Sequence, residues 1–293
     1  MNDKITELKN PLSSKLDQMS THQIVELINS EDSKISLVIK ELIPLISGLI
    51  NKIVQNIKNG GRLIYVGAGT SGRLGVLDAS ECPPTFNVKA NLVVGIISGG
   101  ANALHTSIEG AEDDTKLALK DIKKHKIKKT DTIIGISTSG TTPYVHKFLE
   151  ESKKIGSFTS IITCNKIKKE SYIDNKIQCI VGPEILTGST RMKAGTATKM
   201  ILNIISTTTM IKLNKVYQNF MVDLKISNNK LTNRAINIVS QVTDLNKNES
   251  KNLIVKANGY VKNAILMHLK NKNYIESCKI LKKNNGSLRK SIE

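Results

Sequence analysis

Apolar side chains between residues 20 and 58 recur every three or four positions, which is the spacing of one face of an α-helix. The pattern stops at Asn59-Gly60-Gly61, and glycine after a helical stretch is a common stop signal. The chain is therefore predicted to begin with a helical segment that ends ahead of the first strand.

Five short runs rich in β-branched residues follow this segment. They are largely apolar instead of strictly alternating, which is typical of strands buried on both faces of a parallel sheet. The stretches between them can hold crossover helices. The pattern predicts an α/β fold, an open three-layer sandwich with a five-stranded parallel sheet. The expected strands are Leu63–Gly67, Leu92–Ser98, Thr132–Ser137, Phe158–Cys164 and Ile177–Val181.

Beyond Thr190 the hydrophobic pattern becomes helical. One long helix is predicted over Arg191–Lys212, followed by several shorter ones between Asn229 and Leu288, and no run in this part indicates a strand. We therefore expect a helical N-terminal segment, a sheet domain and a helical C-terminal region. Their expected ranges are 1–54, 55–219 and 220–293.

Composition narrows the classes of function. The 293 residues carry 43 Lys+Arg against 25 Asp+Glu, a formal net charge of +18. Only five of the basic residues are arginine, the side chain that reads bases and phosphates through paired hydrogen bonds. The lysines are spread along the chain without interleaved aromatic residues. We expect no nucleic-acid partner, whereas the positive field suits a small anionic substrate.

Features of membrane, secreted and metal-binding proteins are also missing from the sequence. No apolar run approaches the roughly 20 residues of a membrane span. Residues 1–15 lack the apolar stretch of a secretory signal, so we expect a cytoplasmic protein. The four cysteines show no short paired spacing, which argues against a zinc site and a disulfide framework.

The first predicted strand runs into Gly67-Ala68-Gly69-Thr70-Ser71-Gly72, which matches the GxGxxG pattern of dinucleotide-binding sites. Such sites also need an acidic residue at the end of the second strand, but that strand ends in Ile96-Ile97-Ser98-Gly99-Gly100. The loop is better suited to a terminal phosphate, which accepts hydrogen bonds from hydroxyls as well as backbone N–H groups.

Two further turns are rich in hydroxyl groups. Ser137–Thr142 precedes a helix expected near Pro143, and Thr187–Thr190 precedes the long helix. A single turn of this kind is most often an ordinary helix cap. The carboxyl ends of parallel strands, however, share one edge, where open α/β folds bind ligands. The predicted phosphate-binding residues are Thr70, Ser71, Gly72, Ser137, Ser139 and Thr142, with Ser189, Arg191 and Lys193 as candidate substrate contacts.

Ser137–Thr142 resembles the S-x-S-G-x-T phosphate-binding motif of sugar isomerase (SIS) domains. The loop over 67–75, together with Asp78–Phe86, resembles more specifically the family of N-acetylmuramic acid 6-phosphate etherases. Matching stretches occur in that family's order over most of residues 20–240. The further stretches are Glu109–Asp113, Thr142–Val145, Thr187–Thr196 and Phe220–Asp223.

The resemblance implies an SIS fold and a carbon–oxygen lyase that takes the D-lactyl ether off C3 of N-acetylmuramic acid 6-phosphate. The implied products are N-acetylglucosamine 6-phosphate and D-lactate, which serves recycling of cell-wall amino sugars. The family's catalytic pair falls on Glu81 and Glu112. SIS domains also commonly form homodimers. Thr141 departs from the family pattern, in which arginine is common, and this affects one contact near the phosphate.

Two carboxyl groups are sufficient for this chemistry, without metal or cofactor. The aldehyde of the open-chain sugar acidifies the C2 proton, so a base at C2 and an acid at the lactate oxygen permit elimination, after which water adds. We assign the acid to Glu81 and the base to Glu112, with an exchange of roles left open. Glu81 is expected to precede a loop that Pro83-Pro84 stiffens through fixed φ angles. Glu109 competes with Glu112, because positions three apart share a helical face. His105 is a candidate for opening the sugar ring, although a lone histidine is more often structural.

Two other functions remain open at this point, since one fold serves several chemistries. A sugar-phosphate isomerase would use one of the same carboxylates and would release no lactate. A regulator that senses a sugar phosphate would use the same loops but needs no catalytic carboxyl group. The presence of both Glu81 and Glu112 disfavours the regulator.

Overall fold

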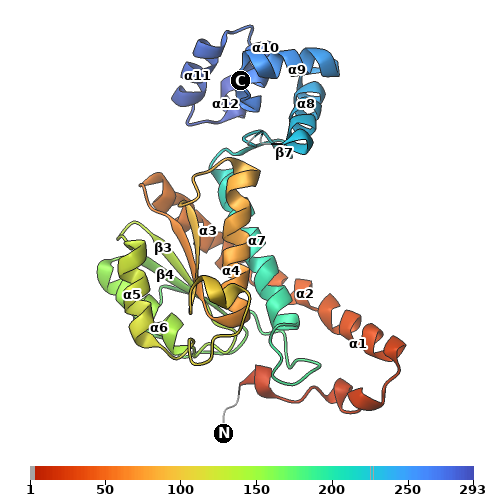
Figure 1. Ribbon diagram of the computed structural model, residues 1–293, viewed down its shortest axis with the longest axis vertical. Helices are drawn as coiled ribbons and strands as arrows, with labels where there is room; N and C mark the ends of the chain where they lie inside the picture. The colour runs from red at the N-terminus through yellow and green to blue at the C-terminus, as the bar shows by residue number, and fades with distance from the viewer. Residues whose placement is uncertain (1–3, 225, 227) are drawn as a thin grey trace. The chain divides into compact units, whose positions relative to one another are not determined.

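The computed structural model describes residues 4–224, 226 and 228–293 of the chain. Its strands are β1 (Leu63–Gly67), β2 (Val93–Ile97), β3 (Thr132–Ile136), β4 (Phe158–Thr163) and β5 (Asn175–Gln178), besides a short hairpin described below. These five form one sheet in the order β2-β1-β3-β4-β5, with every neighbouring pair parallel (Figure 1). The predicted five-stranded parallel sheet is confirmed.

Strand β5 begins earlier than predicted, at Asn175 instead of Ile177. It is an edge strand, and its pairing with β4 starts at polar residues: Asn175 lies opposite Ser160, whose Oγ donates to Asn175 Oδ1 at 3.0 Å. An edge strand tolerates such polar positions because one side of it is unpaired. A search for apolar runs therefore places this strand too late.

Helices cover both faces of the sheet (Figure 1). On one face lie α5 (Thr115–His125) and α6 (Pro143–Ile155), and on the other α3 (Ile43–Lys58) and α4 (Gly69–Phe86). The alternation along β1 follows this arrangement, since Ile64 and Val66 pack with α5 and α6 while Tyr65 meets α4. Beside α4 runs α7 (Lys193–Lys212), and Asp78 Oδ1 of α4 accepts hydrogen bonds from its Asn203 and Ser206 side chains at 2.8 and 2.9 Å.

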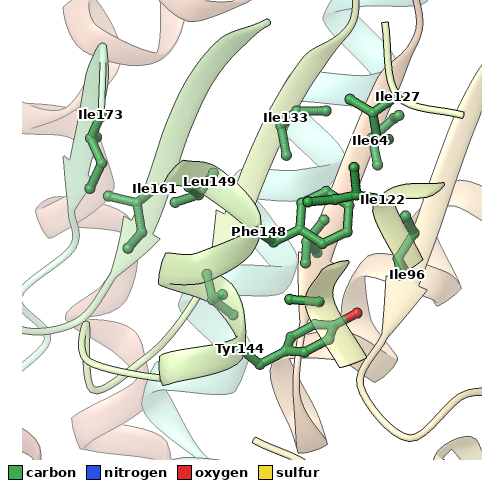
Figure 2. Close-up of a cluster of buried hydrophobic side chains, with 13 residues drawn as sticks. Ile64, Ile96, Ile122, Ile127, Ile133, Tyr144, Phe148, Leu149, Ile161 and Ile173 are labelled. Atoms are coloured by element: carbon green, nitrogen blue, oxygen red, sulfur yellow. The ribbon is translucent and has the colours of Figure 1, made fainter. Parts of the chain in front are cut away.

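The core beneath α5 and α6 is an aromatic and aliphatic cluster (Figure 2). Tyr144 and Phe148 lie within it with ring centroids 6.3 Å apart, and the Tyr144 hydroxyl donates to Asp121 Oδ2 at 2.6 Å. Gly135 of β3 allows α6 to approach the sheet, because a Cβ there would lie 2.7 Å from Val145 Cγ1. This packing fixes the start of α6, which belongs to the candidate site.

The predicted N-terminal helical segment is present in several pieces. Helix α1 begins with a capping box, in which the Ser20 hydroxyl accepts from the Gln23 N–H and the Gln23 side chain accepts from the Ser20 N–H. Successive helices meet at Lys34 and Leu42. Ahead of α3 the elements are the 3-10 helices η1 (Ile5–Glu7), η2 (Pro11–Ser13) and η3 (Leu16–Gln18), then α1 (Thr21–Ser33) and α2 (Ile35–Glu41).

The C-terminal region is helical, as predicted, and has a core of its own around Val239, Ala264 and Ile265. Its helices are α8 (Asn229–Thr243), α9 (Lys247–Lys256), α10 (Val261–Leu269), α11 (Tyr274–Lys283) and α12 (Leu288–Ile292).

The expectation of no strand beyond residue 190 was wrong. Strands β6 (Val216–Tyr217) and β7 (Phe220–Met221) form an antiparallel hairpin. Its turn contains Gln218 in the left-handed region, with a φ of 51°. Two residues per strand are too few to produce a periodic pattern, so the sequence alone gave no signal for it.

Contacts divide the chain into two compact units. The first comprises Met1–Ser80 and Ala90–Ser206, and the second Glu81–Lys89 and Thr207–Glu293. The division therefore falls inside α4 and inside α7. Among the described residues, no helix is both long and apolar enough to cross a membrane.

Candidate active site

The candidate site lies in the first unit, at the carboxyl edge of the sheet. Strand β1 leads into α4, and β3 leads through Ser137–Thr142 into α6, so two helices begin at this edge. Here a pocket of about 480 Å³ opens. It is lined by Lys4, Glu7, Ala68, Gly69, Thr70, Ser71, Glu112, Asp113, Thr138, Ser139, Thr141, Thr142, Pro143, Gly188 and Thr190.

Glycines bring the start of α4 onto the end of β1. A Cβ on Gly72 would lie 2.6 Å from Ile97 Cγ1 and 2.7 Å from the Gly67 carbonyl oxygen, so no larger residue fits without movement. Gly69 takes a left-handed φ of 52° at the first position of the helix. Thr70 and Ser71 consequently occupy the first turn of α4, whose leading N–H groups have no partner within the helix.

The Ser137–Thr142 loop, which we call the hydroxyl loop, is organised around Ser137. The Ser137 side chain is 2% exposed, and its Oγ accepts the N–H of Gly140 at 3.1 Å and that of Thr142 at 3.4 Å. Ser137 Oγ also lies 2.8 Å from Thr142 Oγ1 and 3.4 Å from Ser139 Oγ. Ser137 therefore shapes the loop, while Ser139 and Thr142 line the pocket.

His146 supports the hydroxyl loop from α6. Its Nε2–H donates to the Gly140 carbonyl at 2.8 Å, and its Nδ1 lies within hydrogen-bond distance of the Tyr172 hydroxyl, at 2.9 Å. Gly140 is left-handed, with a φ of 71°. Across the pocket, Ser71 Oγ lies 3.4 Å from Thr138 Oγ1. Sequence reasoning missed His146, because a single histidine on a helix carries no recognisable pattern.

This geometry suits a bound anion. Helices α4 and α6 both begin at the pocket. The positive end of a helix dipole, together with the unpaired N–H groups of the first turn, favours negative charge there. Thr70, Ser71, Ser139 and Thr142 add hydroxyl donors to the same pocket. The structure thus brings together four of the predicted phosphate-binding side chains, with Gly72 and Ser137 directly behind them.

The third hydroxyl-rich turn reaches the pocket through Gly188 and Thr190. Ser189 is half-buried and Arg191 is exposed, and neither lines the pocket. Lys193 is only 3% exposed and forms an ion pair with Glu31 of α1. Burial opposes the charge of Glu31, but hydrogen bonds from Lys193, Lys34 and Asn10 outweigh it and lower the pKa of Glu31 to about 2.

A buried carboxylate holds the start of α7. Glu184 accepts the backbone N–H of Lys193 at 3.0 Å and that of Ala194 at 2.9 Å. Burial raises the pKa of Glu184, and these two hydrogen bonds oppose the rise. The segment that contains the turn ending in Thr190 is therefore closed at both ends by Glu184 and the start of α7.

Glu112 lies at the pocket in a turn that precedes α5, so its expected helical stretch begins only at Thr115. Glu109 also lies in a turn, and the shared helical face proposed for the two residues was wrong. Gly110 between them has a left-handed φ of 70°, and α5 starts only after Asp114, which is extended and caps it by accepting the Leu117 N–H. Glu109 and Glu112 both line a second, smaller pocket of about 180 Å³ adjoining Ala68 and Gly69.

Two contacts tether the segment that carries Glu112. The Ser98 hydroxyl donates to the Ala111 carbonyl at 2.5 Å, and the Glu112 carbonyl accepts the Tyr144 N–H at 3.0 Å. Arg73 of α4 holds the preceding 3-10 helix η4 (Ala101–Leu104) by donating to the Ala103 carbonyl at 3.0 Å. The next residue, His105, is exposed and lines neither pocket.

Glu81 falls in the second unit, at an exposed position on α4. The expectation that Glu81 precedes a loop stiffened by Pro83 and Pro84 was wrong, because α4 continues through both prolines to Phe86. Proline has the φ of a helix, although it removes a hydrogen bond and crowds the preceding turn, and here the helix ends within one turn of both prolines. Glu81 is therefore presented by a helix.

Two residues at the pocket were absent from the sequence prediction. Lys4 and Glu7 reach it from the N-terminal segment, about which the loop motifs carry no information. Among residues 4–224, 226 and 228–293, no three His, Cys, Asp or Glu side chains gather as metal ligands would.

Two protein-family models match stretches of the chain. The model described as glucokinase regulatory protein N-terminal SIS domain matches residues 45–153. The model described as C-terminal lid domain of glucokinase regulatory protein matches residues 218–286. Among solved structures, a phosphoheptose isomerase from Neisseria gonorrhoeae is 12% identical, with a TM-score of 0.48 over 65% of this chain and 98% of that one.

Full-length relatives are more specific. An N-acetylmuramic acid 6-phosphate etherase of Clostridium botulinum (strain Eklund 17B / Type B) is 49% identical over 98% of this chain and 96% of its own length. The enzyme of the same name from Geobacillus sp. (strain WCH70) is 46% identical over 98% of both chains. These relatives favour an ether-cleaving carbon–oxygen lyase over an isomerase or a regulator. The chain belongs to the N-acetylmuramic acid 6-phosphate etherase family.

Proposed function

We propose that this chain cleaves the D-lactyl ether of N-acetylmuramic acid 6-phosphate by elimination and hydration, yielding N-acetylglucosamine 6-phosphate and D-lactate. The observation that carries the proposal is the hydroxyl-lined pocket at two helix N-termini, with Glu112 at its wall, in a chain of the etherase family.

The pocket would hold the phosphate of the sugar. Ser71 and Thr70 donate from the start of α4, and Ser139 and Thr142 donate from the hydroxyl loop. A hydrogen bond to a charged oxygen contributes about 1.5–3 kcal/mol, more than one between neutral groups. Phosphate binding at this place anchors one end of the open-chain sugar and leaves its reacting carbons to be reached by the carboxylates.

Elimination requires a base at C2 and an acid at the oxygen on C3. Glu112 lies on the wall of the pocket and is exposed to solvent, so its carboxyl group is placed there as the base for the C2 proton. Glu81 is the proposed acid, in keeping with its place in the family motif. As the C3–O bond breaks, the Glu81 proton passes to the lactate oxygen, and the electron pair of the C2–H bond forms the double bond.

Hydration completes the reaction. The Glu81 carboxylate left by the first step takes a proton from water as the water oxygen adds to C3, and Glu112 returns a proton to C2. Each carboxyl group thus ends in the state in which it began.

The test is incubation of the purified protein with N-acetylmuramic acid 6-phosphate in ¹⁸O-water, followed by mass spectrometry of both products. Label at the sugar's C3 hydroxyl together with unlabelled lactate is the expected result, because the ether oxygen leaves with lactate. Label in lactate would contradict elimination, and absence of lactate from folded protein would remove the etherase assignment.

We further propose that two copies of the chain form the active enzyme and that it works in the cytoplasm. Homodimers are common among SIS domains, and ionised sugar phosphates stay in the compartment in which they form because charge opposes their passage through a bilayer. Light scattering at working concentration should give about twice the 32.2 kDa chain mass. A single-chain mass for active protein would contradict the dimer.

A further inference from the structure

The charges around the pocket are unbalanced for the ligand that it is proposed to hold. A phosphate monoester carries close to two negative charges at neutral pH. The described lining residues include three carboxylates, those of Glu7, Glu112 and Asp113, and Lys4 is the one cation among them. Helix dipoles and hydroxyls supply only partial positive charge.

Lys4 lies directly over the hydroxyl loop. Its Nζ donates to Thr141 Oγ1 at 2.6 Å, and Thr141 Oγ1 lies 3.3 Å from Ser139 Oγ, which also accepts the Thr141 N–H at 3.3 Å. The ammonium group is therefore one hydroxyl away from a side chain that lines the pocket. A lysine side chain has rotatable bonds enough to move its charge by this short distance.

The backbone that follows Lys4 is held by buried polar contacts. The Thr6 N–H donates to Asn165 Oδ1 at 3.3 Å, and Asn165 Nδ2 donates to Thr6 Oγ1 and to the Thr138 carbonyl, both at 2.9 Å. Thr138 belongs to the hydroxyl loop, so one buried amide joins the N-terminal segment to that loop.

A second anchor lies further along the same segment. Asn10 is buried, and its Nδ2 donates to Glu31 Oε2 at 3.0 Å and to the Pro183 carbonyl at 3.2 Å. With Thr6 and Asn10 both fixed, the segment cannot drift away from the pocket without breaking buried hydrogen bonds. The position of Lys4 is thus part of the folded unit.

We propose that Lys4 is a phosphate-binding residue of this pocket, supplying the full positive charge that its hydroxyls and helix ends lack. This inference rests on the proposed function for the sugar phosphate as ligand. On binding, the ammonium would exchange the Thr141 hydroxyl for a phosphate oxygen. The lactyl carboxylate of the substrate is a second anion that a lysine can bind, so the ligands used in the test must separate the two.

Binding is measured by calorimetry for the wild type and for Lys4→Met, which keeps the length of the side chain and removes the charge. N-acetylglucosamine 6-phosphate carries only the phosphate, N-acetylmuramic acid only the carboxylate, and N-acetylglucosamine neither. Lys4→Met should weaken the affinity for N-acetylglucosamine 6-phosphate on the order of tenfold, as expected for loss of one charged hydrogen bond at a partly exposed site. Its affinities for N-acetylmuramic acid and N-acetylglucosamine should stay within twofold of the wild-type values.

Two further variants make the result specific to charge at this place. Lys9→Met is the matched control, because Lys9 is an exposed lysine of the same segment that does not line the pocket, and its affinities should not change. Thr141→Arg added to Lys4→Met returns a cation to the position that Lys4 contacts, and it should recover most of the lost affinity for the phosphate.

Unchanged affinity of Lys4→Met for the sugar phosphate would overturn the proposal. An equal loss for all three ligands would also overturn it, since that outcome indicates a disturbed fold. Weakening of N-acetylmuramic acid alone would assign Lys4 to the carboxylate instead. Inorganic phosphate, titrated in the same series, tests the role of Lys4 independently of the proposed etherase activity. If Lys4→Met binds inorganic phosphate more weakly than the wild type does, but the wild type produces no lactate, Lys4 is a phosphate-binding residue and the etherase proposal is rejected.

Discussion

Ser137 and Ser139 lie two positions apart in one motif, but their surroundings differ. Ser137 is buried, and its Oγ accepts two backbone N–H groups of its own loop. Ser139 lines the pocket and is partly exposed. A motif read from sequence gives both residues the same role, whereas burial separates a residue that shapes the loop from one that lines the pocket.

Replacing each serine by alanine should reveal this difference. Ser139→Ala should raise KM several-fold and leave the free energy of unfolding nearly unchanged, because besides the proposed ligand contact it loses only long hydrogen bonds within its own loop, such as the exposed one from the Thr141 N–H. Ser137→Ala leaves two N–H groups without their acceptor and should lower the free energy of unfolding by about 1–3 kcal/mol as well as raise KM. Steady-state kinetics and urea unfolding measure both, and equal stability loss in the two variants would contradict this division.

The two proposed catalytic glutamates should show their role in kcat. Glu81→Gln and Glu112→Gln keep the size of the side chain and remove proton transfer, so each should lower kcat on the order of 10²–10⁴-fold with a smaller change in KM. Lactate release gives the rate.

Glu109→Gln is the control for this pair, since Glu109 shares the tethered turn with Glu112 but lines only the smaller pocket. Its kcat should stay within a few-fold of the wild type. Full activity of Glu112→Gln combined with an inactive Glu109→Gln would transfer the base to Glu109.

At the scale of elements, the site depends on how closely α4 starts behind β1. Gly67 and Gly72 make this possible, because each would place a Cβ 2.7 Å from a backbone atom of the other. The glycines of this loop are therefore required for packing, and its hydroxyls reach the pocket only because the backbone turns so tightly.

Gly72→Ala should consequently disturb both stability and binding. Its Cβ would lie 2.6 Å from Ile97 Cγ1, and overpacking of this kind costs about 1–3 kcal/mol. The matched control is Gly48→Ala, an exposed helical position where a Cβ has nothing within 4 Å, and alanine should stabilise α3 there by about 0.5–1 kcal/mol. Thermal unfolding with and without inorganic phosphate distinguishes the variants, and a Gly72→Ala protein as stable as wild type would refute the packing argument.

Sequence patterns predicted the sheet well because buried parallel strands are continuous apolar runs, and Leu63–Gly67 and Thr132–Ile136 are such runs. They predicted less where polar contacts decide the structure. The polar start of β5, the turn that holds Glu109 and Glu112, and the helical presentation of Glu81 all differ from expectation. The hydroxyls of the site were predictable because helix-start chemistry is local, whereas Lys4 reaches the pocket through tertiary contacts that no local pattern contains.

Across the whole first unit, one ion pair links distant parts of the chain. Glu31 of α1 meets Lys193 at the start of α7 and also accepts a hydrogen bond from Asn10. Residues far apart in sequence therefore depend on the ionised state of a single carboxylate. Because Asn10 anchors the segment that carries Lys4, this ion pair also supports the pocket.

Stability should fall in acid through this carboxylate. The ordinary pKa of glutamate is 4.5, and the pKa of Glu31 is lowered to about 2, so its ionised form stabilises the fold above pH 4.5. That contribution is lost progressively as the pH falls from 4.5 towards 2. Urea unfolding across this range should show the gap between wild type and Glu31→Gln shrinking, and a gap that stays constant would contradict the linkage. Glu26→Gln, at an exposed position on the same helix, is the control.

The hydroxyl loop has a consequence for the way in which affinity varies with acidity. Serine and threonine hydroxyls and backbone N–H groups neither gain nor lose protons near neutrality, so these donors stay the same while the medium changes. The phosphate itself takes up a proton near pH 6. Near neutrality, the pH dependence of affinity should therefore follow the protonation of the phosphate and not that of the hydroxyl and N–H donors. A preference for the doubly charged phosphate would appear as tighter binding above that pH.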